Sequence, residues 1–322
     1  MTTKRVAAID CGTNSLRLLI ADIDAASGRL ADVERRMEIV RLGQGVDATG
    51  MLAPEALERT LRALADYAGD IDRSSARAVR MVATSATRDA SNAADFSAGV
   101  EKILGVLPEV ITGAEEAQLS FAGATAELAA ASGAPDAPVP PYLVVDIGGG
   151  STEFVLGGND AAGAAELAAI SVDIGCVRLT ERHLHADPPT EGQIQAATAD
   201  IDRALAAAEA AVPVGDACTL VGLAGSVTTV TAIALGLPFY DPSRTHHARI
   251  TAEAVHGVTT SLLTLPRVER AAIGSLHPGR VDVIGAGALI LDRIMQRFGF
   301  AEMVASEHDI LDGIAWSLAV GG

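Results

Sequence analysis

Residues 142–157 read YLVVDIGGGSTEFVLG, and residues 5–21 read RVAAIDCGTNSLRLLIA, which repeats the same pattern near the start of the chain. In each stretch an apolar run ends in an aspartate, a glycine follows two positions later, and a serine precedes a second apolar run. The register aligns Asp10, Gly12 and Ser15 of the first copy with Asp146, Gly148 and Ser151 of the second. Glycine permits a tight turn, so each copy predicts a β-hairpin turning at the edge of a sheet.

The two turns have the composition of a site for an oxygen-rich anion. Successive glycine N–H groups can point at one ligand, and Asn14, Ser15 and Ser151 add side-chain donors. An aspartate at a strand end suits Mg²⁺, directly or through water. Either turn alone is equally typical of an ordinary hairpin. Their repetition in one register favours two loops that face each other across a cleft and share one anionic ligand.

The two copies differ two residues after the serine, where the first has Arg17 and the second has Glu153. Side chains alternate along a strand, so equivalent positions should point in equivalent directions. We therefore expect one turn to offer a cation to phosphate and the other a carboxylate to a metal ion or to water.

The composition excludes several classes of protein. The chain has 322 residues, is 49% apolar and carries a formal net charge of −17, which argues against a general nucleic-acid binder. Three isolated cysteines argue for a reducing compartment. Residues 217–240 lack charge, but a Gly-Ser pair and several threonines favour a buried strand, a turn and a buried helix over a membrane span. We expect a cytoplasmic protein without nucleic-acid or membrane partners.

The remainder of the chain alternates between strand and helix patterns, which predicts a duplicated α/β architecture. Strands are expected up to residue 10 and over 16–23, 33–40 and 79–83, and helices from about 54, 252 and 285. Capping boxes at Thr112–Glu115 and Thr190–Gln193 begin two further helices. The proline-rich residues 131–142 predict either a surface loop or a boundary between a first domain, residues 1–130, and a second, residues 131–305.

Five ordered motifs resemble the exopolyphosphatase and guanosine pentaphosphate phosphohydrolase family, Ppx/GppA. They are DCGTNSLRLLIADI, ATSATRDASN, ITGAEEAQLSFAGA, DIGGGSTEFVLG and GLAGSVTTVTAIA, and the resemblance covers essentially the whole chain. It implies the actin-like ATPase fold of the sugar kinase, Hsp70 and actin superfamily, with two ribonuclease H-like domains and an interdomain cleft. In that fold the C-terminal helix, residues 306–322, would return to complete the first domain. The chain is similar to a short form of the family, without the C-terminal helical domains, so we expect a preference for short polyphosphate.

The resemblance also implies roles for individual residues. Glu116 matches the family's catalytic base. The capping box leaves Glu115 a structural role, and Glu116, one position on, points about 100° away. Asp146 and Glu153 match residues associated with a divalent metal, expected to be Mg²⁺ or another divalent cation. The matches to substrate contacts are Asn14, Ser15, Arg88, Gly148, Gly149 and Ser151, with Gly225 and Ser226 in a later loop of the channel.

The predicted activity is an exopolyphosphatase that releases orthophosphate from inorganic polyphosphate, and the family implies a homodimer. Removal of the terminal phosphate of guanosine pentaphosphate is the alternative. A sugar kinase or ATPase would need an adenosine pocket, which no motif indicates. A sensor without activity would lack a base such as Glu116. The pair His246-His247 is interpreted as a surface turn, because no acidic or cysteine partner is suitably spaced in the sequence.

Overall fold

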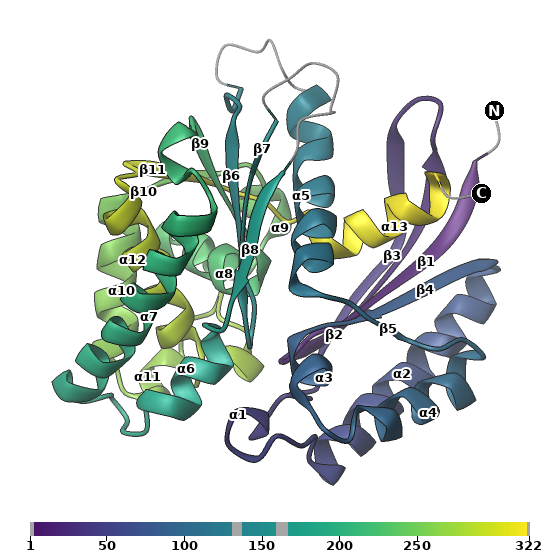
Figure 1. Ribbon diagram of the computed structural model, residues 1–322, viewed down its shortest axis with the longest axis horizontal. Coiled ribbons are helices and arrows are strands. Elements are labelled where there is room, and N and C mark those ends of the chain that lie inside the picture. Colours follow the sequence, from purple (N-terminus) through teal and green to yellow (C-terminus); the bar gives the residue numbers. More distant parts are fainter. Residues whose placement is uncertain (1–2, 131–136, 159–166, 321–322) are drawn as a thin grey trace. The chain divides into compact units, whose positions relative to one another are not determined.

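The computed structural model describes residues 3–130, 137–158 and 167–320, and they fold into two compact units (Figure 1). The first comprises Met1–Gly123 with Ile310–Gly322, and the second comprises Ala124–Asp309. The chain passes from one unit to the other within a single helix, upstream of the proline-rich stretch where the sequence placed the boundary. It returns at 309/310 instead of the predicted 305/306.

The first unit is built on a five-stranded sheet of order β3-β2-β1-β4-β5. β1 pairs antiparallel with β2 and parallel with β4. The strands are β1 Lys4–Cys11, β2 Ser15–Asp24, β3 Arg29–Ile39, β4 Ala78–Ala83 and β5 Glu109–Val110. The helices are α1 Val46–Thr49, α2 Pro54–Ser74, α3 Ser85–Asp89, α4 Ala93–Leu104, α5 Gly113–Ala130, which ends in the second unit, and α13 Ile310–Val320.

Helices cover both faces of this sheet, as Figure 1 shows. Ala7 and Ile9 of β1 pack into the core that contains Leu64 of α2. The alternate residues Val6 and Ala8 pack on the opposite face with side chains of α13. Burial on both faces explains why the strand is an unbroken apolar run up to its aspartate.

The second unit repeats this plan with one added strand, in the order β10-β11-β9-β6-β7-β8. The strands are β6 Tyr142–Ile147, β7 Thr152–Gly157, β8 Ala168–Val172, β9 Thr219–Leu223, β10 Arg249–Thr251 and β11 Glu302–Ala305. The helices are α6 Cys176–His183, α7 Glu191–Ala211, α8 Ala224–Ala234, α9 Pro242–Thr245, α10 Ala252–Thr264, α11 Arg267–Arg270 and α12 Ile284–Phe298, with short 3₁₀ turns η1 Val214–Asp216 and η2 Pro278–Arg280.

The five strands of the first sheet correspond to five of the six strands of the second, with β10 added at one end, which supports the prediction of a duplicated α/β architecture. In each, an antiparallel hairpin (β1–β2 or β6–β7) carries a third antiparallel strand on one side and parallel strands on the other. The predicted hairpins are present, but their placement at a sheet edge was wrong. β1 and β6 are interior strands, because parallel strands β4 and β9 pair with their other sides.

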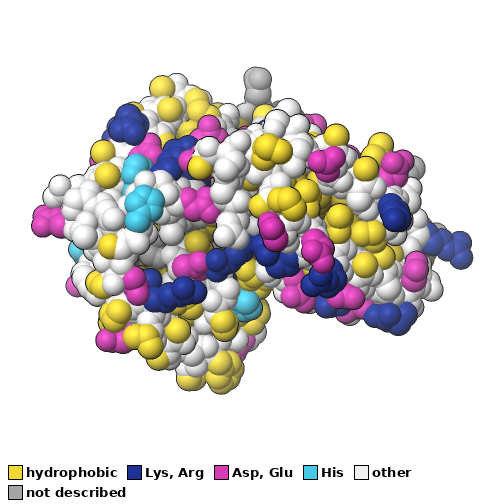
Figure 2. All heavy atoms as spheres, turned by 90° about the horizontal axis from the view of Figure 1, so that it is seen from below, with side chains coloured by type: hydrophobic (Ala, Val, Ile, Leu, Met, Phe, Trp, Pro, Cys, Tyr) yellow, Lys and Arg dark blue, Asp and Glu magenta, His cyan; other side chains and the backbone are white. Residues whose placement is uncertain are grey.

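Most local predictions hold, and the exceptions are instructive. Within the apolar residues 217–240, strand β9 is followed directly by α8, so Gly225 and Ser226 lie in the first turn of a helix rather than in a separate turn. Among the described helices, none is both long enough and apolar enough to cross a bilayer. On the face drawn in Figure 2, basic and acidic side chains lie interspersed.

Candidate active site

The turn between β1 and β2 is closed by a hydrogen bond from Gly12 N–H to the Ser15 carbonyl at 3.0 Å. Asp10 and Arg17 stand directly opposite each other on the two strands. The Nε and Nη2 groups of Arg17 donate to Oδ2 of Asp10 at 2.9 and 2.6 Å. The Asp10 side chain is only 5% exposed, so this ion pair compensates a carboxylate that lies almost wholly out of water.

The turn between β6 and β7 has the same closing bond, from Gly148 N–H to the Ser151 carbonyl at 3.0 Å. Here the residues that stand opposite each other are Asp146 and Glu153. Both are buried, at 7% and 1% exposure, and Oε1 of Glu153 accepts a hydrogen bond from Ser171 Oγ at 2.6 Å. The predicted equivalence of Arg17 and Glu153 is therefore confirmed in register.

The carboxylate pair in the second hairpin fits a divalent cation. Like charges directly opposite on neighbouring strands repel, and burial strengthens the repulsion. Carboxylate oxygens are the ligands that Mg²⁺ and Ca²⁺ prefer. Asp146 and Glu153 together therefore have the chemistry of a hard-cation site, which the Asp10–Arg17 pair lacks.

The glycine loop of the second hairpin is held by the N-terminus of α6. The Gly148 carbonyl accepts from Cys176 N–H at 3.0 Å, and the Gly149 carbonyl accepts from Val177 N–H at 2.9 Å. Within the part of the chain that the structure describes, the N–H groups of Gly149 and Gly150 donate no hydrogen bond. The carbonyls of the loop thus accept hydrogen bonds from α6, while the N–H groups of Gly149 and Gly150 could donate to an anion.

The first hairpin is braced differently. The Asn14 carbonyl accepts from the N–H groups of Val40 and Arg41 at 3.0 and 2.9 Å, and Thr13 Oγ1 lies 3.2 Å from Ser85 Oγ. The side-chain Oδ1 of Asn14 is buried and has no hydrogen-bond partner among the described residues. A 180° rotation of this amide would present its NH₂ group instead, so the position suits a ligand that accepts hydrogen bonds.

Two glutamates at the start of α5 have different environments, as predicted. Glu115 completes the capping box: its Oε2 accepts from Thr112 N–H at 2.9 Å, and its own N–H donates to Thr112 Oγ1 at 3.2 Å. The backbone hydrogen bond from Thr112 lowers the pKa of this exposed carboxyl. Glu116 is 8% exposed, and its Oε2 accepts from Arg88 Nη1 at 3.1 Å. Arg88 also donates to the Ile111 carbonyl at 3.0 Å, which fixes its position beside the helix start.

The first turn of α8 is contacted by a basic residue of η2, Arg280, that sequence reasoning missed. Arg280 Nη1 donates to the Gly225 carbonyl at 2.9 Å, and a Cβ built on Gly225 would lie 2.1 Å from the Arg280 guanidinium carbon. A larger residue at position 225 would therefore have to displace the Arg280 guanidinium from this contact. Ser226 hydrogen-bonds the buried Cys176, whose pKa is raised by burial, so the α8 turn and the α6 N-terminus meet at the glycine loop. No pattern around Arg280 indicated this contact.

Comparison with known proteins identifies the family. The model of the Ppx/GppA phosphatase family matches residues 19–319. The chain belongs to this family. It is 50% identical to a Mycobacterium tuberculosis protein named exopolyphosphatase 2, over 99% of this chain and 100% of that protein. The crystal structure of an exopolyphosphatase-like protein superposes with a TM-score of 0.90 at 45% identity, covering 97% of this chain and 98% of that one.

A Ppx/GppA family member from Aquifex aeolicus superposes with a TM-score of 0.78 at 30% identity and 99% coverage of both chains. These findings confirm the predicted resemblance, the actin-like two-domain fold and the class of phosphatase. Within the Ppx/GppA chain, the structure groups the predicted residues by unit. Asn14, Ser15, Arg17, Arg88 and Glu116 belong to the first unit, and Asp146, Gly148, Gly149, Ser151, Glu153, Gly225 and Ser226 belong to the second. That the two turns share one ligand stays a prediction.

Proposed function

We propose that this Ppx/GppA protein is an exopolyphosphatase that hydrolyses terminal phosphoanhydride bonds of inorganic polyphosphate and releases orthophosphate. The name of the relative from Mycobacterium tuberculosis, at 50% identity, supports this assignment. The observation that carries it is the pair formed by Glu116 and Arg88 at the start of α5. A buried carboxylate beside a fixed guanidinium combines a base for water with a cation for phosphate.

In this proposal Glu116 orients the attacking water and accepts its proton. Arg88 neutralises charge on the transferring phosphoryl group, for which in-line attack needs little covalent help from the protein. The Arg88–Glu116 contact holds both side chains before substrate binds. In the second unit, the backbone donors of Gly149 and Gly150 bind phosphoryl oxygens, aided by the hydroxyl of Ser151.

Asp146 and Glu153 would hold the divalent cation, and their burial opposite each other supports that role. When bound, Mg²⁺ supplies positive charge to phosphoryl oxygens and so lowers the barrier to attack. Asn14 and Ser15 are proposed as phosphate contacts from the first unit, because the buried Asn14 amide has an unsatisfied polar atom among the described residues. Arg17 is held on Asp10, and a phosphate contact by Arg17 would therefore share the guanidinium between two anions.

Two further predictions about this activity remain open to measurement. Guanosine pentaphosphate is the alternative substrate, and side-by-side assays with polyphosphates of defined length would compare the two. A cytoplasmic location and a homodimeric assembly also stay predictions. Gel filtration with light scattering would test the assembly.

The test of the proposal is Glu116→Gln, which keeps the shape of the side chain and removes the base. We expect phosphate release from polyphosphate to fall about 10²–10⁴-fold in kcat, because positioned bases contribute that much. Glu115→Gln is the matched control: glutamine preserves a capping box, so kcat should stay close to wild type. Near-wild-type turnover by Glu116→Gln with the fold intact would overturn the assigned base.

A further inference from the structure

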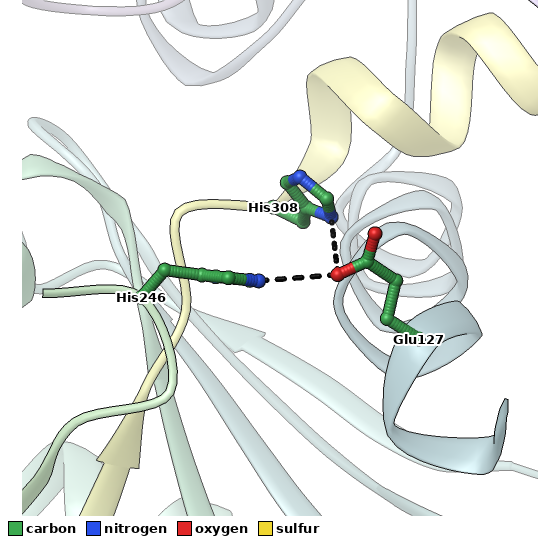
Figure 3. A group of neighbouring side chains, drawn as sticks. All are labelled: Glu127, His246 and His308. Carbon is green, nitrogen blue, oxygen red and sulfur yellow. Dashed lines mark hydrogen bonds and ion pairs between the residues drawn. The ribbon is translucent and has the colours of Figure 1, made fainter. Parts of the chain in front are cut away.

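Three potential metal ligands converge in the second unit, far from one another in sequence. Glu127 lies on α5, His246 directly follows α9, and His308 precedes α13. Figure 3 shows the two imidazole rings directed at the same carboxylate oxygen. Oε2 of Glu127 is 3.1 Å from Nε2 of His246 and 3.5 Å from Nδ1 of His308. Among the described residues, this is the only group of three or more His, Cys, Asp or Glu side chains whose ligand atoms converge in this way.

The sequence reasoning discarded His246 because no acidic partner is nearby in the chain. The structure supplies one at a separation of 119 residues, together with a second imidazole. The interpretation of His246 as part of a surface turn therefore missed Glu127 and His308, the two side chains with which it could bind a metal ion. Side chains of three separate segments meet here, and all three ligand atoms lie within 4.8 Å of one another.

The spacing suits a tetrahedral ion with nitrogen and oxygen ligands. Zn²⁺ binds such atoms at about 2.0–2.1 Å, so neighbouring ligands around it lie about 3.3 Å apart. The two spacings from Glu127, 3.1 and 3.5 Å, bracket that value. We propose that Glu127, His246 and His308 form a binding site for Zn²⁺ or a similar first-row transition-metal ion, with water in the fourth position. Two imidazoles make this site softer than the carboxylate pair Asp146–Glu153, which favours Mg²⁺.

The surroundings of His246 affect the strength of this site. Nδ1 of His246 accepts a hydrogen bond from the N–H of Glu307 at 3.2 Å, so Nε2 carries the proton that points at Glu127. A metal ion at Nε2 moves that proton to Nδ1, and the Glu307 amide loses its acceptor. In most zinc sites the second ring nitrogen of the histidine donates a hydrogen bond to an acceptor, so we expect the metal ion to bind more weakly here than in such sites. The ring of His247 stacks on that of His246, with the ring centroids 3.7 Å apart.

The position of the site along the chain suggests what binding does. The chain enters the second unit within α5 and leaves it between His308 and α13. Glu127 and His308 therefore flank the two covalent connections between the units. An ion held by both residues ties the connecting segments to each other and to the loop after α9.

The experiment titrates metal-free, full-length protein with Co²⁺ in the presence of excess Mg²⁺, which occupies hard oxygen sites. Tetrahedral Co²⁺ absorbs visible light, so the spectrum reports coordination directly and does not depend on enzyme activity. We expect one Co²⁺ per chain, displaced by Zn²⁺. Glu127→Gln and His246→Ala should each weaken Co²⁺ binding at least about tenfold. Loss of a side chain that only supports a metal ligand already costs about 10–100-fold in affinity, and loss of the ligand itself should cost at least as much.

The matched control is His256→Ala. His256 also pairs with a single carboxylate, Asp292, at 3.0 Å, but it is not part of the convergent group. This variant should bind Co²⁺ as wild type does. Absence of tetrahedral Co²⁺ absorption in the wild type, or equal binding by all variants, would overturn the proposal. If His246→Ala reduces thermal stability, the partly exposed Glu127→Gln decides the outcome alone, since it changes one oxygen and keeps the volume.

Discussion

The hairpins β1–β2 and β6–β7 have the same backbone arrangement but carry different charges. In each, a hydrogen bond of 3.0 Å from a glycine N–H to a serine carbonyl closes the turn, and an aspartate lies near the end of the interior strand that precedes the turn. The residue opposite that aspartate is Arg17 in the first unit and Glu153 in the second. This single difference replaces an ion pair, which has no net charge, with two buried carboxylates. The two units therefore keep the same hairpin and differ in the charges that it carries.

The largest expected effect comes from neutralising the second hairpin with Glu153→Gln. We expect phosphate release to fall about 100-fold or more, because a ligand to the proposed cation is lost. In Mg²⁺-free buffer the same variant should be up to about 1 kcal/mol more stable than wild type, since one of two opposed carboxylates has lost its charge. Turnover against Mg²⁺ concentration and urea unfolding without Mg²⁺ measure the two effects. Unchanged turnover at every Mg²⁺ concentration would remove Glu153 from the cation site.

Glutamine at the equivalent position of the first hairpin, Arg17→Gln, should lower the stability of the protein instead of raising it. It leaves the buried Asp10 carboxylate without the cation that contacts its Oδ2. Breaking a fully buried pair costs about 3–5 kcal/mol, and we expect about 2 kcal/mol here because Arg17 is 20% exposed. Urea unfolding gives the difference, and Arg17→Lys serves as a control that retains the charge. Equal stabilities for Arg17→Gln and wild type would mean that the ion pair is not what supports Asp10.

The smallest effect distinguishes the two turn glycines. A Cβ on Gly12 would lie 3.6 Å from the Ser15 carbonyl oxygen, an ordinary contact, whereas a Cβ on Gly148 would lie 3.1 Å from that of Ser151. Gly12→Ala should therefore change the free energy of unfolding by less than about 0.5 kcal/mol. Gly148→Ala should destabilise by about 1 kcal/mol, because the turn must open slightly. Thermal unfolding of the two variants measures the difference, and a larger loss of stability for Gly12→Ala than for Gly148→Ala would contradict the argument from the Cβ contacts.

Features that depend on neighbouring residues could be predicted from the sequence. The capping boxes at Thr112 and Thr190 are present, because their hydrogen bonds span three residues. The equivalence of Arg17 and Glu153 follows from alternation along the repeated strands, whereas the strand pairing shows that each stands opposite an aspartate. The helix expected from about residue 54 is also present as α2, and Leu64, Tyr67 and Ile71 lie on its buried face.

Features that depend on distant segments could not be predicted in this way. The interior position of both hairpins arises from pairing with β4 and β9, which lie far along the chain. Arg280 reaches Gly225 across 55 residues, with no motif around it. The carboxylate that His246 contacts comes from a helix in another part of the chain.

The amino-acid sequence by itself determined the duplicated hairpins, the acidic and glycine positions within them and the family, because local backbone preferences and strand alternation operate over a few residues. Only the tertiary structure decided which polar groups meet across distant segments: Arg88 with Glu116, Arg280 with the Gly225 carbonyl, and Glu127 with two histidines. Such contacts form when packed sheets and helices bring side chains within a few ångströms. Packing depends on the whole core, and no short pattern records it.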